Sequence, residues 1–256
     1  FTTNNHNYVV WNWKAGNATL GTGDFTQGSN ASTCSRSVEA GFSIVNWTGN
    51  QTAGATVGHG LSKAPELFIV KSRSAAGAWM VYHTSLGAPD KTLALDNTRA
   101  VETEDPAYSF NDTAPTSSVF SLGSGNTTNG NGRTLLAYCF HSVEGYSKVA
   151  SYKGNGNADG TFVYTGFRPA FVMLKKVDNA ANGSSWVIND SKRLGYQPFN
   201  YRLRANTTGG EDDNTRIDLL SNGFKLRQTY QEANENNVTY IYLAFAETPF
   251  KHSNAR

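Results

Sequence analysis

Acidic residues fall in two short clusters, one in each half of the chain, that hard cations could use. The clusters consist of Glu102, Glu104 and Asp105, and of Glu211, Asp212 and Asp213. Ca²⁺ takes oxygen ligands from acidic loops, so each cluster is a candidate Ca²⁺ site. The EF-hand spacing is missing, and a solvated, charged loop tip is the preferred interpretation. The sequence therefore predicts no cofactor, with Ca²⁺ as the alternative.

Two aromatic residues lie just before Gly-Asn turns. Trp47 is followed by Asn50, and Tyr152 is followed by Asn155. An exposed ring can stack on a sugar while a neighbouring amide binds its hydroxyl groups. These four residues are therefore the candidate glycan-binding residues. A protein–protein interface is the competing interpretation, because interfaces also favour Tyr and Trp with little Lys or Glu.

Catalytic patterns are missing from the sequence. It contains no Gly-x-Ser-x-Gly nucleophile elbow, and its glycine runs lack the spacing of a phosphate-binding loop. A glycosidase would need two carboxylates facing each other across a cleft, which one acidic loop does not establish. We therefore expect the protein not to be an enzyme, and keep a carbohydrate-active enzyme module as the last alternative.

The composition restricts the possible partners. The 256 residues carry a net charge of +2, so nothing favours binding to nucleic acid. No apolar run approaches the length of a membrane span, so we expect no membrane insertion. Gly, Asn, Ser and Thr are abundant and strong helix formers are scarce, which favours strands and turns.

An internal repeat organises the chain. The pairs Trp47 and Tyr152, and Asn50 and Asn155, are both 105 positions apart. The same offset relates Thr134–Phe140 to Thr239–Phe245. Aromatic residues that recur on apolar strands, such as Trp79 and Trp186, are predicted to pack in the core. Such constant order and spacing indicate two tandem copies of one domain.

Each copy is predicted to be a β-sandwich. Its apolar segments are short, rich in β-branched and aromatic residues, and bounded by Gly, Pro, Asn and Asp. We therefore expect an all-β protein with two jelly-roll-like sandwiches of about 105 residues, at 39–143 and 144–256, the second with a short C-terminal tail. Residues 1–38 are predicted to hold a strand from an earlier module and a Gly/Ser/Thr-rich linker.

Several blocks of the sequence resemble one family of proteins. The blocks are 41–50, 57–65, 137–146, 164–171, 220–226 and 244–247. In this order they resemble the tail-fibre-like virion proteins of marine phages, including cyanophages. In that family the tandem β repeats usually follow a concanavalin A-like lectin domain, and residues 8–15 are similar to the end of such a domain.

The resemblance implies a structural component of a virion, as part of a tail fibre or appendage that contributes to recognition of host-surface glycans. It implies a homotrimer in contact with other virion proteins, located in the extracellular particle. The alternative is a capsid decoration or fibre-shaft protein with purely structural contacts. The family supplies no catalytic residues for this chain.

Overall fold

The computed structural model describes residues 8–103, 107–178, 184–193, 201–213 and 217–249. Within them the protein is almost entirely β-structure, as predicted, and its strands pair antiparallel in several sheets. One turn of α-helix, α1 (Asn126–Asn129), and one 3₁₀ turn, η1 (Thr84–Leu86), interrupt the strands. None of the described helices is long and apolar enough to cross a membrane.

The first repeat is a sandwich of a large sheet and a small sheet. The large sheet has the order β1 (Ser32–Ser37), β2 (Phe42–Thr48), β9 (Thr134–Phe140), β4 (Leu67–Ser72), β5 (Met80–His83), β6 (Lys91–Ala94) and β7 (Glu102–Thr103). The small sheet pairs β3 (Ala55–Gly58) with β8 (Val119–Leu122). Strand alternation turns every second side chain of the large sheet toward the small one. Phe68, Phe120 and Leu135 lie fully buried between the two sheets.

The second repeat has the same plan with fewer strands. Its large sheet has the order β10 (Ser147–Lys153), β17 (Thr239–Ala246), β12 (Pro169–Lys176), β13 (Val187–Asp190) and β14 (Arg202–Arg204). Its small sheet has the order β11 (Phe162–Tyr164), β16 (Gly223–Leu226) and β15 (Ile217–Leu220). Val163 faces Phe224 in this repeat as Val57 faces Phe120 in the first, so β11 corresponds to β3.

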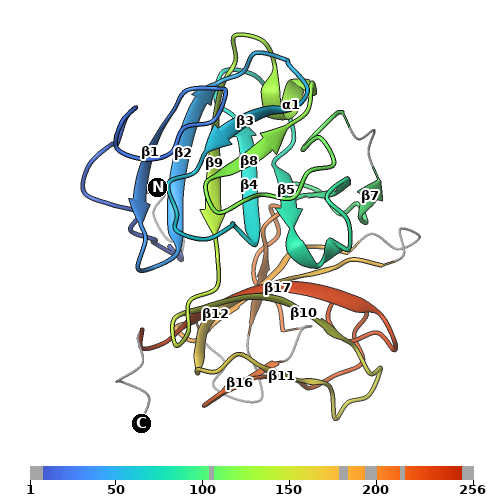
Figure 1. Ribbon diagram of the computed structural model, residues 1–256. Coiled ribbons are helices and arrows are strands. Elements are labelled where there is room, and N and C mark those ends of the chain that lie inside the picture. The colour runs from blue at the N-terminus through green and yellow to red at the C-terminus, as the bar shows by residue number, and fades with distance from the viewer. Residues whose placement is uncertain (1–7, 104–106, 179–183, 194–200, 214–216, 250–256) are drawn as a thin grey trace.

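The two large sheets also pack against each other, and a third core lies between them. Phe42, Leu67 and Phe140 of the first repeat meet Phe171 and Phe245 of the second there. Figure 1 shows the two sandwiches one above the other, with the first repeat on top. Each large sheet is therefore covered on both faces over much of its area, which explains the nearly continuous apolar sequence of β9 and β17.

The segment before the first repeat differs from the prediction in two ways. Residues 32–37, expected in a linker, form β1 and pair along the whole of β2. The strand predicted within residues 1–38 does not form at residues 8–14, which lie in no strand. Instead Trp11 and Trp13 lie on a sheet face, with ring centroids 5.6 and 5.4 Å from that of Phe171. Because their rings pack on a face, this segment does not extend a sheet edge.

Candidate functional site

The aromatic rings predicted to bind glycan are buried, so that prediction is wrong for them. Trp47 is 4% exposed and packs edge-on against Phe120. Tyr152 is 8% exposed, and its hydroxyl donates to the carbonyl oxygen of Ala233 at 2.7 Å. Both side chains point into the sandwich between the large and small sheets, where no sugar can stack on them.

The two predicted asparagines hold the sandwich together at equivalent corners. The backbone N–H of Asn50 donates to Oδ1 of Asn129 at 3.0 Å, and Nδ2 of Asn129 donates to Oδ1 of Asn50 at 3.2 Å. Asn155 and Asn234 form the same pair of bonds, both at 3.0 Å. Asn129 and Asn234 are fully buried and also 105 positions apart, a signal that the sequence contained and our prediction missed.

Close backbone contacts explain why a glycine precedes each of Asn50 and Asn155. A Cβ on Gly49 would lie 2.3 Å from the carbonyl oxygen of Gly130, and one on Gly154 would lie 2.3 Å from that of Glu235. Two backbone segments approach at these points more closely than any other residue allows. The repeated Gly-Asn motif is therefore a structural corner in both repeats.

Three carboxylates of the candidate Ca²⁺ clusters, those of Glu102, Glu211 and Asp212, are paired with arginines. Glu102 lies 2.6 Å from Arg99. In the second cluster, Glu211 lies 3.4 Å from Arg193, and Asp212 lies 2.6 Å from Arg202. Among the residues that the structure describes, no three His, Cys, Asp or Glu side chains gather as metal ligands. Asp213 belongs to the same loop, and Glu104 and Asp105 lie outside the described residues.

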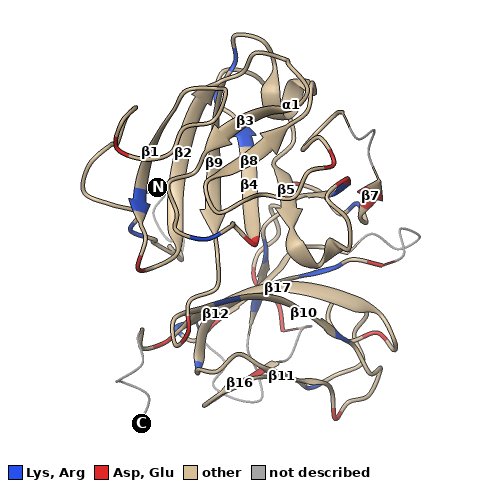
Figure 2. Cartoon of the chain, viewed as in Figure 1, with Lys and Arg blue, Asp and Glu red and all other residues tan. Residues whose placement is uncertain are grey.

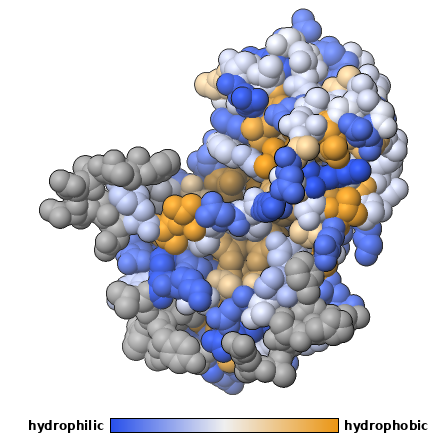
Figure 3. Space-filling model, turned by 90° about the vertical axis from the view of Figure 1, so that its left-hand side faces the viewer, coloured by the Kyte–Doolittle hydropathy of each residue, from blue (hydrophilic) through white to orange (hydrophobic). Residues whose placement is uncertain are grey.

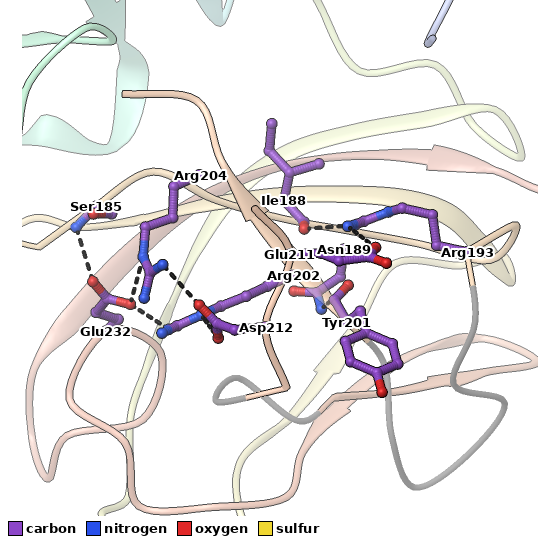
Figure 4. A network of polar contacts seen from close by, with 10 residues as sticks. All are labelled: Ser185, Ile188, Asn189, Arg193, Tyr201, Arg202, Arg204, Glu211, Asp212 and Glu232. Carbon is purple, nitrogen blue, oxygen red and sulfur yellow. Dashed lines mark hydrogen bonds and ion pairs between the residues drawn. The ribbon is translucent and has the colours of Figure 1, made fainter. Parts of the chain in front are cut away.

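Arg202 organises a buried charge network in the second repeat (Figure 4). Its guanidinium is fully buried, pairs with Asp212 and Glu232, and lies 4.8 Å from the ring centre of Tyr230. Arg204 also reaches Asp212, at 2.8 Å. Each positive charge thus has a carboxylate partner, as burial requires. The network belongs to the framework of the second repeat.

Three histidines are buried in the first repeat and serve the fold. The ring of His59 accepts a hydrogen bond from the N–H of Leu61 and contacts the carbonyl oxygen of Thr116, each at 3.1 Å. Burial lowers the pKa of His59 to about 4 and that of His83 to about 4. His141 contacts the carbonyl oxygen of Ser142 at 3.0 Å. Each ring is thus engaged by neighbouring backbone.

An apolar cavity of about 410 Å³ opens between the two repeats. Its floor is the outer face of the first repeat's large sheet, and its far wall is formed by the second repeat. Figure 3 shows hydrophobic residues in the recess between the two lobes. Aromatic side chains that line it include Trp11, Trp13, Trp79 and Tyr138.

Beyond this cavity the same sheet face becomes polar. Strand alternation places Ile44, Asn46 and Thr48 of β2 on one face, so the cavity wall continues directly into polar residues. A second hollow of about 440 Å³ lies there, and its lining includes Thr33, Asn46, Thr48, Arg73 and Thr134. We call the two hollows together the sheet-face groove. Charged residues are sparse on the strands of this repeat (Figure 2).

Trp79 and Tyr138 line the apolar cavity, and Thr134, on the same face of β9 as Tyr138, lines the polar hollow. The two ring planes lie within 7° of parallel, with centroids 6.4 Å apart. Nζ of Lys71 lies 5.6 Å from the ring centre of Trp79 and donates to the carbonyl oxygen of Gly77 at 2.5 Å. Both rings are half-buried and keep part of their surface in the groove. The prediction that Trp79 is a core residue like Trp186 is therefore only half right.

Trp186 and Lys175, the counterparts of Trp79 and Lys71 in the second repeat, are covered by residues of the first repeat. Trp186 is 1% exposed, and its Nε1 donates to the carbonyl oxygen of Ala94 at 2.8 Å. Nζ of Lys175 donates to the carbonyl oxygen of Thr98 at 3.2 Å, and burial lowers the pKa of Lys175 to about 8. The end of β6 and the loop after it thus cover in the second repeat what remains open in the first.

Comparison with known proteins gives one match. A family described as a domain of unknown function (DUF7483) matches residues 1–249. The chain belongs to the DUF7483 family. No curated protein and no solved structure matches the chain. The DUF7483 match runs through both repeats and the segment before them, so the family unit includes the groove and both sandwiches.

Proposed function

We propose that this DUF7483 protein is a non-enzymatic component of a phage virion, a tail fibre or appendage, that binds a host-surface glycan in the sheet-face groove. The virion assignment rests on the resemblance of its sequence blocks to tail-fibre-like proteins. The binding assignment rests on the groove. In an assembled fibre the protein would act as a homotrimer among other virion proteins.

The observation that carries the binding proposal is the position of Trp79 and Tyr138. Two nearly parallel rings lie in one groove, and the neighbouring positions on the same face carry hydroxyl and amide groups. A sugar has an apolar face that stacks on such rings and hydroxyl groups that exchange hydrogen bonds with Thr and Asn side chains. The groove therefore offers both kinds of contact in one place.

The framework of the groove suits a recognition role. Tyr138 and Thr134 stand on β9, and Asn46 and Thr48 stand on β2, both interior strands of the large sheet, while Trp79 directly precedes β5. Hydrogen bonds such as that from Trp186 to Ala94 tie the second repeat to the first. A site on rigid strands keeps its geometry without the entropy cost of ordering a loop.

The lining of the groove argues against hydrolysis. Neither hollow includes a carboxylate or a histidine among its described lining residues. A retaining or inverting glycosidase needs two carboxyl groups on either side of the bond that it cleaves. A capsid decoration or fibre-shaft role with purely structural contacts remains the second candidate, favoured by the almost wholly apolar lining of the cavity between the repeats.

The test is binding of the full chain to a glycan array and to host envelope fractions, with Trp79→Ala as the site variant. Tyr164→Ala is the matched control, because Tyr164 is 65% exposed and lies on β11 of the other repeat. We expect binding by the wild type and by Tyr164→Ala, and loss of binding by Trp79→Ala. Absence of binding to every glycan and envelope fraction, or binding that Trp79→Ala leaves intact, would refute the proposal.

A further inference from the structure

One side of the first repeat is closed by the segment that precedes it. The backbone N–H of Asn30 donates to the carbonyl oxygen of Thr56 at 2.9 Å, and the N–H of Thr56 donates to Oγ of Ser29 at 2.9 Å. Oγ of Ser32 donates to the carbonyl oxygen of Gly58 at 3.0 Å. The outward edge of β3 is therefore bonded to this segment at successive positions.

The same segment continues into the large sheet. It becomes β1 and pairs with β2 from Ser32 opposite Trp47 to Ser37 opposite Phe42. One continuous extended stretch, residues 29–37, thus closes the edges of both sheets. Gly28 allows the close approach at its start, since a Cβ there would lie 2.2 Å from the carbonyl oxygen of Thr56.

Among the residues that the structure describes, the corresponding edges of the second repeat end their sheets. β10 corresponds to β2 and is the last strand of its large sheet, and β11 corresponds to β3 and is the last strand of its small sheet. The short connection from β9 reaches only the start of β10, where the N–H of Ser147 bonds Val143 and that of Val149 bonds Oγ of Ser142. It has no residues left to continue along the edge.

The free edges can be located residue by residue. The N–H of Gly154 donates to the carbonyl oxygen of Val238, and the N–H of Ala246 donates to that of Tyr146. Even-numbered residues of β10 therefore bond to β17, and alternation turns the N–H and C=O of Ser151 away from it. In the small sheet, the carbonyl oxygen of Thr161 and the N–H of Thr165 bond toward β16. By the same alternation, the backbone N–H and C=O groups of Phe162 and Tyr164 point away from β16. Within the described part of the chain, no strand pairs with these outward groups.

Apolar surface accompanies the unpaired backbone. Phe162 is 44% exposed and Tyr164 is 65% exposed, and they occupy the positions of Thr56 and Gly58 in the first repeat. Ala150 is half-buried on β10, whereas its counterpart Val45 is fully buried beside Cys34 of β1. Unpaired strand edges beside exposed aromatic rings are typical of sites where another chain adds a strand.

We propose that the outward backbone groups of Ser151 on β10 and of Phe162 and Tyr164 on β11 form a docking site for an extended segment of a partner polypeptide. The segment pairs antiparallel to β10 around Ser151, as β1 pairs with β2 around Asn46. The partner segment is rich in small polar residues, like residues 26–35, so that its backbone can approach both edges. Lys148 and Lys153 on β10 favour a segment that is neutral or acidic. This site is separate from the sheet-face groove and does not depend on glycan binding.

The probe is a fluorescently labelled peptide of residues 26–35 that carries Cys34→Ser, titrated into the full chain and followed by fluorescence anisotropy. The peptide copies the segment that fits the equivalent edges of the first repeat, where the chain's own segment already occupies the position. We expect saturable binding. A peptide of the same composition in scrambled order should bind more weakly.

Three variants locate the binding. Ser151→Pro removes an outward N–H without loss of a bond to β17, and should weaken binding by about tenfold. Ser151→Ala keeps the N–H and should bind like the wild type. Tyr164→Ala removes an exposed ring and no backbone hydrogen bond between strands, and it should also weaken binding. This variant tests the site even if Ser151→Pro does not fold. No saturable binding by the wild type, or equal affinity for wild type, Ser151→Pro and Tyr164→Ala, would overturn the proposal.

Discussion

The two repeats are built on one plan but expose different surfaces. In the first repeat the segment 29–37 closes the outer strand edges, while Trp79, which contacts Lys71, lines an open groove. In the second repeat no described strand pairs with the corresponding edges, while Trp186 and Lys175 are sealed by the end of β6 and the loop that follows it. Two copies of one sandwich thus expose different surfaces, a groove in the first and strand edges in the second, because different segments cover the equivalent positions.

Removal of the sealed tryptophan should have the largest effect. Trp186→Ala deletes a ring that is 1% exposed and its hydrogen bond to Ala94. We expect the free energy of unfolding to fall by about 4 kcal/mol, as for other buried tryptophans. Urea denaturation followed by circular dichroism measures the change. A loss as small as that of an exposed residue would show that the seal between the repeats is weak.

Removal of the buried asparagines tests the part of the plan that both repeats share. Asn129→Ala and Asn234→Ala each leave the N–H of the facing asparagine and two or more carbonyl groups without their partner. We expect a loss of about 2–3 kcal/mol in each case, because buried polar groups left unpaired lose their solvation. Denaturation of the two variants side by side should give similar values, and strongly unequal values would contradict equivalence of the corners.

Mild acid should weaken the first repeat through its buried histidines. In the unfolded chain a histidine takes up a proton below its ordinary pKa of 6.5, whereas folded His59 and His83 stay neutral down to a pKa of about 4. The unfolded state therefore binds protons first, and stability falls as the pH drops from 6.5 toward 4. We expect a loss of about 2 kcal/mol per histidine between pH 7 and pH 5.

The control for this pH dependence is His59→Gln, measured at the same two pH values. The difference between wild type and variant cancels the contribution of the carboxylates, which titrate in both proteins. The variant should lose about half of the histidine-dependent change. An identical pH dependence in both proteins would mean that His59 does not resist protonation in the folded state.

Removal of the groove tryptophan should have the smallest effect on stability. Trp79→Ala deletes a half-buried ring and its contact with the ammonium group of Lys71. We expect a loss of about 1 kcal/mol in the free energy of unfolding, well below that of Trp186→Ala. The same denaturation experiment measures it. A loss equal to that of Trp186→Ala would assign Trp79 to the core and remove it from the groove.

The sequence predicted the class of fold from local features. Short β-branched and aromatic segments between Gly, Pro and Asn predicted the strands, and the offset of 105 between equivalent residues such as Trp47 and Tyr152 agrees with their equivalent places in the two sandwiches. Strand β1 was not predicted, because residues 32–37 are mostly small and polar. Its pairing depends on the open edge of β2 rather than on the strand propensity of these residues.

The site could not be predicted in the same way. The burial of Trp47 and the exposure of Trp79 depend on which sheet or loop covers each face, and that is a property of the assembled sandwiches. Likewise, the acidic cluster at 211–213 gave no sign that arginines from β14 would pair with its carboxylates. Residue type indicated the chemistry that was available, and the tertiary packing decided which residues carry it.

Amide hydrogen exchange, resolved by NMR, tests most directly the claim that equivalent edges are closed in one repeat and open in the other. Asn46 pairs with β1 and corresponds to Ser151, and the N–H of Thr56 donates to Ser29 at the position that corresponds to Phe162. We predict strong protection of the amides of Asn46 and Thr56, and rapid exchange at Ser151 and Phe162. Equal protection at the four amides would contradict the account.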